Sequence, residues 1–254
     1  MSWLYADPIL GLRPEDCYWY HTLDLPGGMM QGDWDLRGKV GEYLGGVDFK
    51  GARVLDAAAA NGCLTYFMES RGAEVVSLEL GARHALERDI IPCLNPRSTD
   101  SLIEHQGRVT NGYWYAHEQL QSQAKLIYGS VYAIPKSLGV VDISVFGCVL
   151  LHLRDPFLAL QQGLHLTTKT AIVVEPAWYS EELAEDCLKF IPKPWAEEFT
   201  ATWWQLSPQM IQQFLAVLGF EDSVVTYHEQ IGWDHELKRL CTVVAQRTRP
   251  MGVA

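Results

Sequence analysis

Two acidic residues of this sequence, Asp56 and Glu79, each close a short apolar run and stand 23 residues apart. The stretch VLDAAAANGCLTYF places Asp56 before a small-residue turn and a helix-like run, and EVVSLE ends at Glu79. The carboxyl ends of neighbouring parallel strands meet at one sheet edge, where open α/β sheets bind ligands. A carboxylate there can accept both hydroxyls of a ribose, so the pair predicts a nucleoside-containing cofactor. A merely solvated Glu79 is the alternative.

The turn after Asp56 distinguishes between cofactors. A dinucleotide fingerprint, G-x-G-x-x-G, would put Cys63 where its third glycine belongs, which is a poor fit. The pattern D-x-G-x-G-x-G, typical of methyltransferases that use S-adenosylmethionine (SAM), fits better, with Ala58, Ala60 and Gly62 in its glycine positions. SAM has no phosphate to press onto backbone amides, so small residues suffice. We expect negative φ at both alanines and close strand–helix packing at Gly62.

Three titratable residues are candidate catalysts: His21, His152 and Glu175. Methyl transfer from a sulfonium is a direct displacement that depends on alignment, and a hydroxyl nucleophile also needs a base. His152 follows an apolar run and Glu175 ends one, so both can reach a strand-end cleft. Each has a structural alternative: His152 would orient the following loop, Glu175 would cap a turn, and His21 would belong to an aromatic cluster.

Aromatic residues gather in two long segments and suit an apolar or planar small-molecule substrate. They could instead attach these segments to the core, or stack on flipped bases. The net charge of -11 argues against nucleic acid. The candidate substrate contacts are Trp114, Trp178, Trp203 and Trp204.

The elements that would position these residues alternate between strands and helices. This alternation predicts an α/β fold with a Rossmann-like, mostly parallel seven-stranded sheet, an antiparallel last strand and helices on both faces. Residues 1–50 would form an N-terminal extension that packs on or caps a domain at 51–254, with inserted lid segments at 82–125 and 176–206. The predicted strands are 53–56, 74–79, 126–128, 140–146, 171–175, 223–229 and 240–246, and the helices are 62–70 and those beginning at Pro156 and Pro208.

Composition argues against a secreted, membrane-spanning or metal-binding protein. The chain has 254 residues, no signal-peptide pattern, and a longest apolar run, Val145–Leu151, that is too short to span a membrane. Six cysteines without a C-x-x-C pair suggest reduced thiols and a cytoplasmic protein. No set of side chains has metal-ligand spacing, so we expect no metal.

The sequence resembles the class I SAM-dependent methyltransferases, and within them proteins related to the tRNA wobble-uridine 5-methoxy/carboxymethoxy methyltransferases. The resemblance covers roughly residues 18–247. It departs from the usual pattern at Ala58, where Gly is usual, and at Glu79, where Asp is common. The motifs that carry it are Trp19-Tyr20-His21, Asp24-Leu25, Gly28, Gly32, Asp35, Arg37, the stretch 54–73, and FGCVLLHLRDP at 146–156.

The resemblance implies roles for particular residues, with SAM as donor, S-adenosylhomocysteine (SAH) as product, and a carboxylated SAM as an open alternative donor. Residues from the turn would line the methionine and adenosine, the end of the second strand would hold the ribose, and N-terminal residues would cover the cofactor. The turn residues are Asp56, Ala57, Ala58, Asn61 and Gly62, the ribose residues are Glu79 and Leu80, and the covering residues are Tyr20 and His21. Ser130 and Val131 would lie at the adenine, and Phe146 and Gly147 under the sulfonium.

These observations favour a SAM-dependent methyltransferase that acts on a small molecule, by O- or C-methylation. A tRNA wobble-uridine methyltransferase is the alternative within the same chemistry. A non-catalytic SAM-binding or sensing protein and a nicotinamide oxidoreductase are alternatives of other classes. The sequence leaves open whether the protein forms an oligomer.

Overall fold

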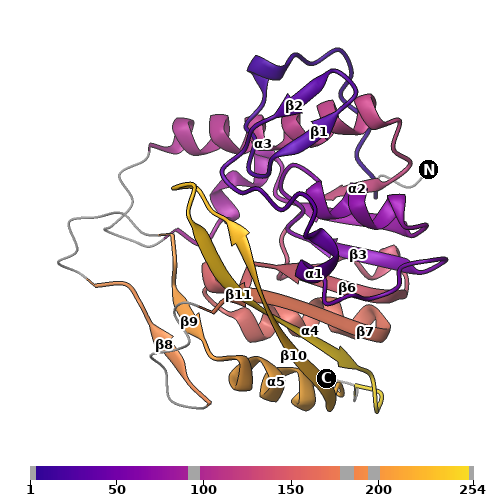
Figure 1. Ribbon diagram of the computed structural model, residues 1–254, viewed down its shortest axis with the longest axis vertical. Helices are drawn as coiled ribbons and strands as arrows, with labels where there is room; N and C mark the ends of the chain where they lie inside the picture. Colours follow the sequence, from indigo (N-terminus) through magenta and orange to yellow (C-terminus); the bar gives the residue numbers. More distant parts are fainter. Residues whose placement is uncertain (1–3, 91–97, 178–185, 194–200, 252–254) are drawn as a thin grey trace.

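A seven-stranded sheet forms the centre of the computed structural model, which describes residues 4–90, 98–177, 186–193 and 201–251 (Figure 1). Its strand order is β10-β11-β7-β6-β3-β4-β5, and β11 pairs antiparallel with both neighbours while the inner strands pair in parallel. The predicted α/β sheet with an antiparallel last strand is confirmed. The strands are β3 (Arg53–Ala57), β4 (Glu74–Glu79), β5 (Lys125–Tyr128), β6 (Val141–Gly147), β7 (Thr167–Pro176), β10 (Asp222–Ile231) and β11 (Leu237–Gln246).

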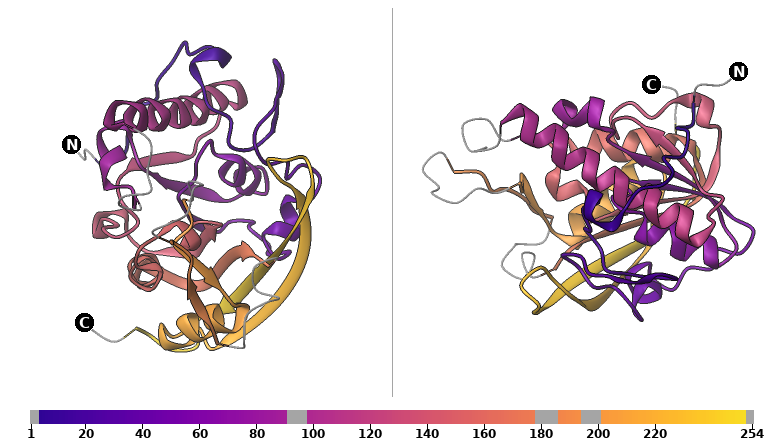
Figure 2. Two further views of the ribbon diagram at one scale, coloured as in Figure 1. Left: turned by 90° about the vertical axis from the view of Figure 1, so that its left-hand side faces the viewer. Right: turned by 90° about the horizontal axis from the view of Figure 1, so that it is seen from above.

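Helices cover both faces of the sheet, as expected (Figures 1 and 2). Asp155 and Ser207 cap α4 and α5 by accepting hydrogen bonds from the backbone N–H three residues on, at 2.9 and 3.1 Å. On one face lie α1 (Val40–Tyr43), α2 (Cys63–Ser70) and α3 (Thr99–Leu120), and on the other α4 (Pro156–Leu166) and α5 (Pro208–Val217).

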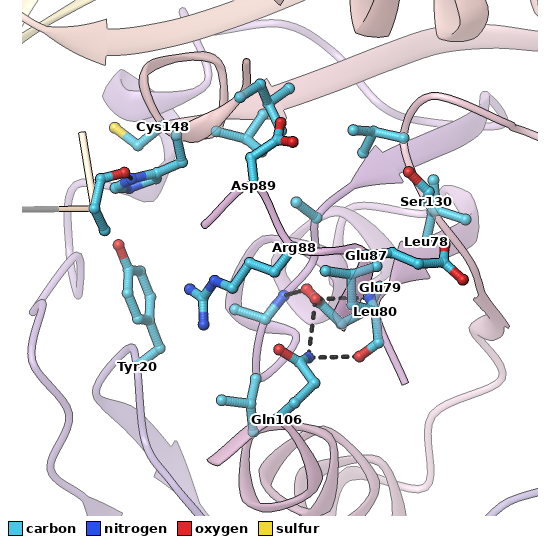
Figure 3. Close-up of a pocket in the computed structure, with 18 of the residues that line it drawn as sticks. Tyr20, Leu78, Glu79, Leu80, Glu87, Arg88, Asp89, Gln106, Ser130 and Cys148 are labelled. Atoms are coloured by element: carbon cyan, nitrogen blue, oxygen red, sulfur yellow. Dashed lines mark hydrogen bonds between the residues drawn. The ribbon is translucent and has the colours of Figure 1, made fainter. Parts of the chain in front are cut away.

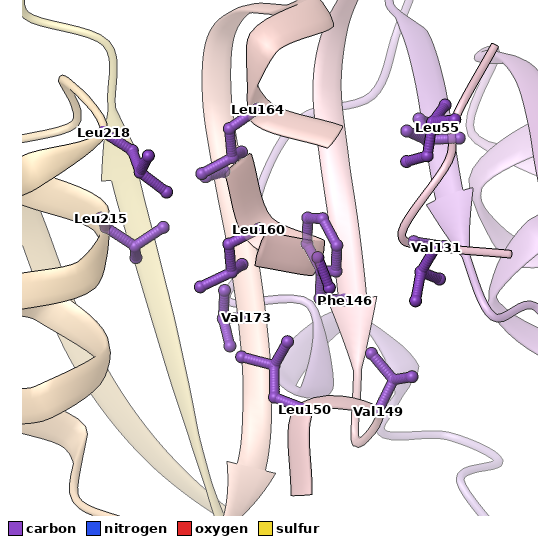
Figure 4. Close-up of a cluster of buried hydrophobic side chains, with 14 of the residues drawn as sticks. Leu55, Val131, Phe146, Val149, Leu150, Leu160, Leu164, Val173, Leu215 and Leu218 are labelled. Carbon is purple, nitrogen blue, oxygen red and sulfur yellow. The ribbon is translucent and has the colours of Figure 1, made fainter. Parts of the chain in front are cut away.

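Alternating strand residues build two hydrophobic layers, because successive side chains of a strand point to opposite faces. In β3, Val54 packs with the layer under α2 and α3, whereas Leu55 packs with the layer under α4 and α5. Figure 4 shows this second layer, where Phe146 lies beside Leu160 and Val173, and Leu215 and Leu218 continue the layer towards α5. Phe146 is fully buried in it.

Several elements were not predicted. Helix α3 occupies half of the segment 82–125 and is the crossover between β4 and β5. A hairpin of β1 (Leu23–Leu25) and β2 (Gly28–Met30) lies beside α3, and a second hairpin pairs β8 (Leu188–Phe190) with β9 (Trp204–Leu206) (Figure 1). The short 3-10 turns are η1 (Pro14–Asp16), η2 (Ala82–Glu87), η3 (Lys136–Leu138) and η4 (Leu150–His152).

The strand order reverses beside β3. The chain runs from β3 to β4 and β5 on one side and returns to β6 and β7 on the other. This switch opens a crevice at the carboxyl ends of β3, β4 and β6, the usual ligand position in such sheets.

Candidate functional site

A cavity of about 340 Å³ opens at this crevice (Figure 3). It is bounded by the turn after β3, the end of β4, the segments after β5 and β6, residues of α3 and the N-terminal segment. Nine of the residues predicted from the sequence line it: Tyr20, His21, Ala58, Glu79, Leu80, Ser130, Val131, Gly147 and His152.

The turn after β3 corrects one prediction. Ala58 and Ala60 have φ of 63° and 48°, not the negative values expected. The cause is local, since the amides of Ala58 and Ala59 both donate to the carbonyl of Leu78, at 2.8 and 3.1 Å, and so bend the chain sharply. Left-handed backbone costs a residue with a Cβ about 1–2 kcal/mol. The turn therefore has the geometry of a glycine loop although alanines occupy it.

Glu79 ties this turn to the end of β4. Its carboxylate accepts hydrogen bonds from the amides of Ala60 at 2.6 Å and Leu80 at 2.8 Å, and from Gln106 Nε2 at 3.2 Å (Figure 3). Burial raises the pKa of Glu79, while these donors act in the opposite direction. Because a carboxylate offers about four lone-pair sites and these three donors occupy three of them, the group can still accept a hydroxyl from a ligand in the cavity.

His21 is held against the same turn by Asn61. The side-chain oxygen of Asn61 accepts from the His21 amide at 3.1 Å and lies 3.2 Å from Nδ1, while Asn61 Nδ2 donates to the His21 carbonyl at 2.9 Å. This arrangement assigns the ring proton to Nδ1 and leaves Nε2 as the basic nitrogen. Burial lowers the pKa of His21 to about 4, so the ring is neutral at pH 7.

His152 reaches the cavity in the same chemical form. It ends the η4 turn after β6, and its Nδ1 lies 2.9 Å from the carbonyl oxygen of Ala201. A carbonyl can only accept, so Nδ1 carries the proton and Nε2 is free to accept one. Burial lowers the pKa of His152 to about 4. Two of the three histidines that line the cavity, His21 and His152, are thus neutral imidazoles with fixed tautomers.

Glu175 lies beneath η4 and does not line the cavity. Its Oε1 accepts from the amide of Leu150 at 2.9 Å, which caps the turn that carries His152. Oε2 is buried without a partner among the described residues, and burial raises the pKa of Glu175 to about 8. The geometry matches the capping alternative.

Other predicted residues lie around the cavity without lining it. Asp56 is buried below the turn and accepts from the Thr65 hydroxyl at 2.6 Å. Ala57 and Phe146 belong to the core, Asn61 holds His21, and Gly62 directly precedes α2 with φ of 83°. These residues therefore support the cavity lining from behind.

The predicted tryptophans have similar supporting positions. Trp114 is buried between α3 and the sheet and donates to the Tyr128 hydroxyl at 2.7 Å. Trp203 donates through Nε1 to the carbonyl of Asp89 at 2.9 Å, and Trp204 to that of Arg154 at 3.2 Å. None of these three lines the cavity, and Trp178 lies outside the described residues.

Sequence reasoning missed an important part of the lining. Arg88 and Asp89 follow η2, Gln106 lies on α3, and Cys148 follows β6 with φ of 50°. The one available signal for the first three was that the long segment 82–125 should build a site. It could not indicate which of its polar residues face the ligand.

The described ranges contain neither a cluster of metal ligands nor a helix that could cross a membrane. No group of three or more His, Cys, Asp or Glu side chains there could hold a metal ion. In the same ranges, every helix is too short or too polar to cross a membrane.

Comparison with known proteins supports the fold. No family model matches the sequence, and no curated protein matches it. Among solved structures, the N-terminal domain of EvdMO1, determined in the presence of SAH and D-fucose, is 18% identical with a TM-score of 0.53, covering 92% of this chain and 93% of that one. Magnesium protoporphyrin IX methyltransferase from Synechocystis PCC 6803 with bound SAH is 15% identical with a TM-score of 0.51, covering 82% and 80%.

A third match is TehB from Haemophilus influenzae, 11% identical with a TM-score of 0.51, covering 82% of this chain and 62% of that one. Identities this low relate folds and not substrates. The chain therefore shares the fold of these structures, one of which is a methyltransferase with bound SAH.

Proposed function

We propose that this protein is a SAM-dependent methyltransferase that acts on a small-molecule acceptor. The observation that carries the proposal is the position of Glu79. This residue ends β4, lines the cavity and accepts a hydrogen bond from the Ala60 amide in the turn after β3. The acceptor site that this carboxylate retains suits a hydroxyl of a ribose. The small residues of the turn suit a cofactor without a phosphate. The shared fold with a methyltransferase with bound SAH agrees with this assignment.

Each part of the cavity has a place in the proposal. Glu79 and Leu80 would hold the ribose, Ser130 and Val131 the adenine, and Ala58 and Gly147 would flank the methionine end. When bound, SAM supplies the methyl group. The remaining task is to align a nucleophile and, for a hydroxyl, to accept its proton.

His21 and His152 are the candidate proton acceptors. Both are neutral at pH 7, and in both the proton sits on Nδ1, so Nε2 is available. We assign Tyr20 to the cover over the cofactor, beside His21, with a ring-centroid separation of 4.8 Å. Glu175 has a positioning role through the η4 turn, and Asp56 a supporting one below the loop.

The cavity favours a small molecule over tRNA. Arg88 is the single Lys or Arg among its described lining residues, which is few for a surface that must follow a phosphate backbone. A protein that only binds SAM needs no space for a methyl acceptor. The cavity continues past the turn to His152, Leu153 and Ala201, which leaves such a space and disfavours a purely sensing role. A methyl-transfer assay with labelled SAM, offered separately a small-molecule library and bulk tRNA, distinguishes these possibilities.

The first prediction concerns cofactor binding. Titration calorimetry should show binding of SAM and SAH but not NAD, and Glu79→Gln should weaken SAH at least about tenfold, or about 1.4 kcal/mol. The amide keeps the size of the side chain but loses the charge that strengthens its hydrogen bond to the ligand. Glu104→Gln, an exposed carboxylate of α3 outside the cavity lining, is the matched control and should leave the affinity unchanged. Binding of NAD, or failure to bind SAH, contradicts the proposal.

A further inference from the structure

The cavity residue Arg88 has no assigned contact with the cofactor in the proposed site. Arg88 follows η2, and its guanidinium extends into the cavity between Glu79 and Tyr20 (Figure 3). Among the residues that the structure describes, no carboxylate lies within ion-pair distance of it. Its charge nevertheless acts on three neighbours: it lowers the pKa of Tyr20 and Glu79 against the larger effect of burial, and it adds to the lowering of the pKa of His152. A permanent positive charge thus faces the centre of the cavity.

The neighbouring Asp89 does not neutralise this charge, because its carboxylate is already engaged. It accepts from the Arg154 amide at 2.6 Å and from the Tyr132 hydroxyl, and it pairs with the Arg154 guanidinium at 3.7 Å. In Figure 3 the Asp89 carboxylate is directed away from the Arg88 guanidinium. Arg88 and Asp89 are therefore consecutive in the chain, but their side chains contact different groups.

The backbone at Arg88 is anchored on both sides. Its amide donates to the carbonyl of Ala85 at 3.4 Å, and the amide of Ile90 donates to its carbonyl at 2.7 Å. The Trp203 indole holds the next carbonyl, that of Asp89, at 2.9 Å. The side chain thus starts from a fixed point at the cavity wall.

The chemistry of this group specifies its ligand. A guanidinium is always charged and presents its N–H donors in a planar fork that matches a carboxylate. A ligand that filled the cavity without an anion would strip water from this charge and leave it unpaired, which is strongly unfavourable. The sulfonium of SAM would bring a second positive charge into the same space. An anionic acceptor offsets both.

We propose that Arg88 binds a carboxylate of the acceptor, so that the substrates are small apolar or planar carboxylic acids. This inference rests on the proposed methyltransferase function and deepens it. The acid end would lie at Arg88, and the nucleophile would lie towards His152, which lines the same cavity. Arg88 would thereby determine specificity without taking part in methyl transfer.

The test compares acids with their neutral amides on SAH-loaded protein. Salicylate, 4-hydroxybenzoate and indole-3-acetate are titrated beside salicylamide, 4-hydroxybenzamide and indole-3-acetamide. In the wild type at least one acid should bind at least about tenfold more tightly than its amide. Arg88→Gln should abolish that preference and leave SAH affinity unchanged within about twofold. Arg83→Gln, an exposed arginine of η2 outside the lining, is the matched control.

Two results would overturn the inference. One is that no acid is preferred to its amide in the wild type. The other is that Arg88→Gln weakens SAH but not 5′-methylthioadenosine, which lacks the amino-acid part, because the partner of Arg88 would then be the cofactor's own carboxylate. Failure of SAH to bind the wild type would instead refute the proposed function, and the acid–amide comparison without SAH would still decide the role of Arg88.

Discussion

At the scale of single residues, the turn after β3 stores backbone strain. Ala60 lies at φ of 48°, whereas Ala59 beside it is outside the left-handed region. Ala60→Gly relieves about 1–2 kcal/mol of strain and loses part of this to the greater freedom of the unfolded chain. We expect the free energy of unfolding in urea to rise by about 1 kcal/mol. Ala59→Gly gains no relief and should lower it, so a shift of both variants in one direction contradicts the assignment.

The same alanines show what residue types alone can predict. The spacing of Asp56, Ala58, Ala60 and Gly62 indicated a cofactor turn, but the sign of φ follows from two amides that share the Leu78 carbonyl. That bond joins residues twenty positions apart, and no local pattern encodes it. Arg88 was missed for a related reason, since its position depends on the tertiary contacts of Asp89 and Trp203.

At the scale of elements, Gly62 fixes how α2 leaves β3. It has φ of 83°, and a Cβ there would lie 2.5 Å from the ring of Tyr66, whose hydroxyl donates to the Tyr113 carbonyl at 2.6 Å. Gly62→Ala combines left-handed strain with overpacking and should lower the free energy of unfolding by about 3 kcal/mol.

Gly51 provides the control, because it has φ of 70° and open space around its Cα. Gly51→Ala should lower the free energy of unfolding by only about 1 kcal/mol. Equal losses in the two variants, measured by urea unfolding, would mean that the Tyr66 contact does not constrain the start of α2.

The η4 turn should respond to pH through Glu175. Its pKa is raised by burial from 4.5 to about 8, so the folded state retains a proton that the unfolded state releases. Stability from this group is complete below about pH 4.5 and is lost as the pH rises to about 8, by at most about 1.4 kcal/mol per pH unit. Glu175→Gln removes this loss. The melting temperature of the variant minus that of the wild type should therefore increase as the pH rises from about 4.5 to about 8.

The exposed Glu104→Gln on α3 controls for the loss of one carboxyl group. A constant difference in melting temperature between Glu175→Gln and the wild type from pH 5 to pH 8.5 would show that Glu175 does not titrate in this range.

Elements differed in how well the sequence predicted them. Strand β4 was predicted at 74–79, and α4 and α5 at Pro156 and Pro208, because apolar runs and capping residues are local signals. Helix α3 was not predicted, and its aromatic run was interpreted as part of a lid. Tyr113, Trp114 and Tyr115 are consecutive yet all buried, because α3 packs between the sheet and the N-terminal segment. A helix covered on both sides lacks a clear polar face.

At the scale of the whole molecule, the N-terminal segment closes over the sheet. The Tyr18 amide donates to the carbonyl of Arg108 on α3 at 2.8 Å, His21 is held by Asn61 beside the turn, and the Asp35 amide donates to the Ile231 carbonyl of β10 at 2.9 Å. Tyr18, Tyr20 and His21 all line the cavity. A ligand in the cavity would therefore contact the segment and the central sheet together.

This connection predicts how SAH stabilises the protein. SAH at one hundred times its dissociation constant should add about 2.7 kcal/mol to the free energy of unfolding and raise the melting temperature. Because opening of the N-terminal segment would also release the ligand, amide hydrogen exchange at residues 18–22 should slow with SAH, together with that of the turn at 58–62. The β10–β11 connection at 232–236, which does not line this cavity, should be unchanged. Protection of the turn without protection of 18–22 would show that the segment packs on the domain without covering the cofactor.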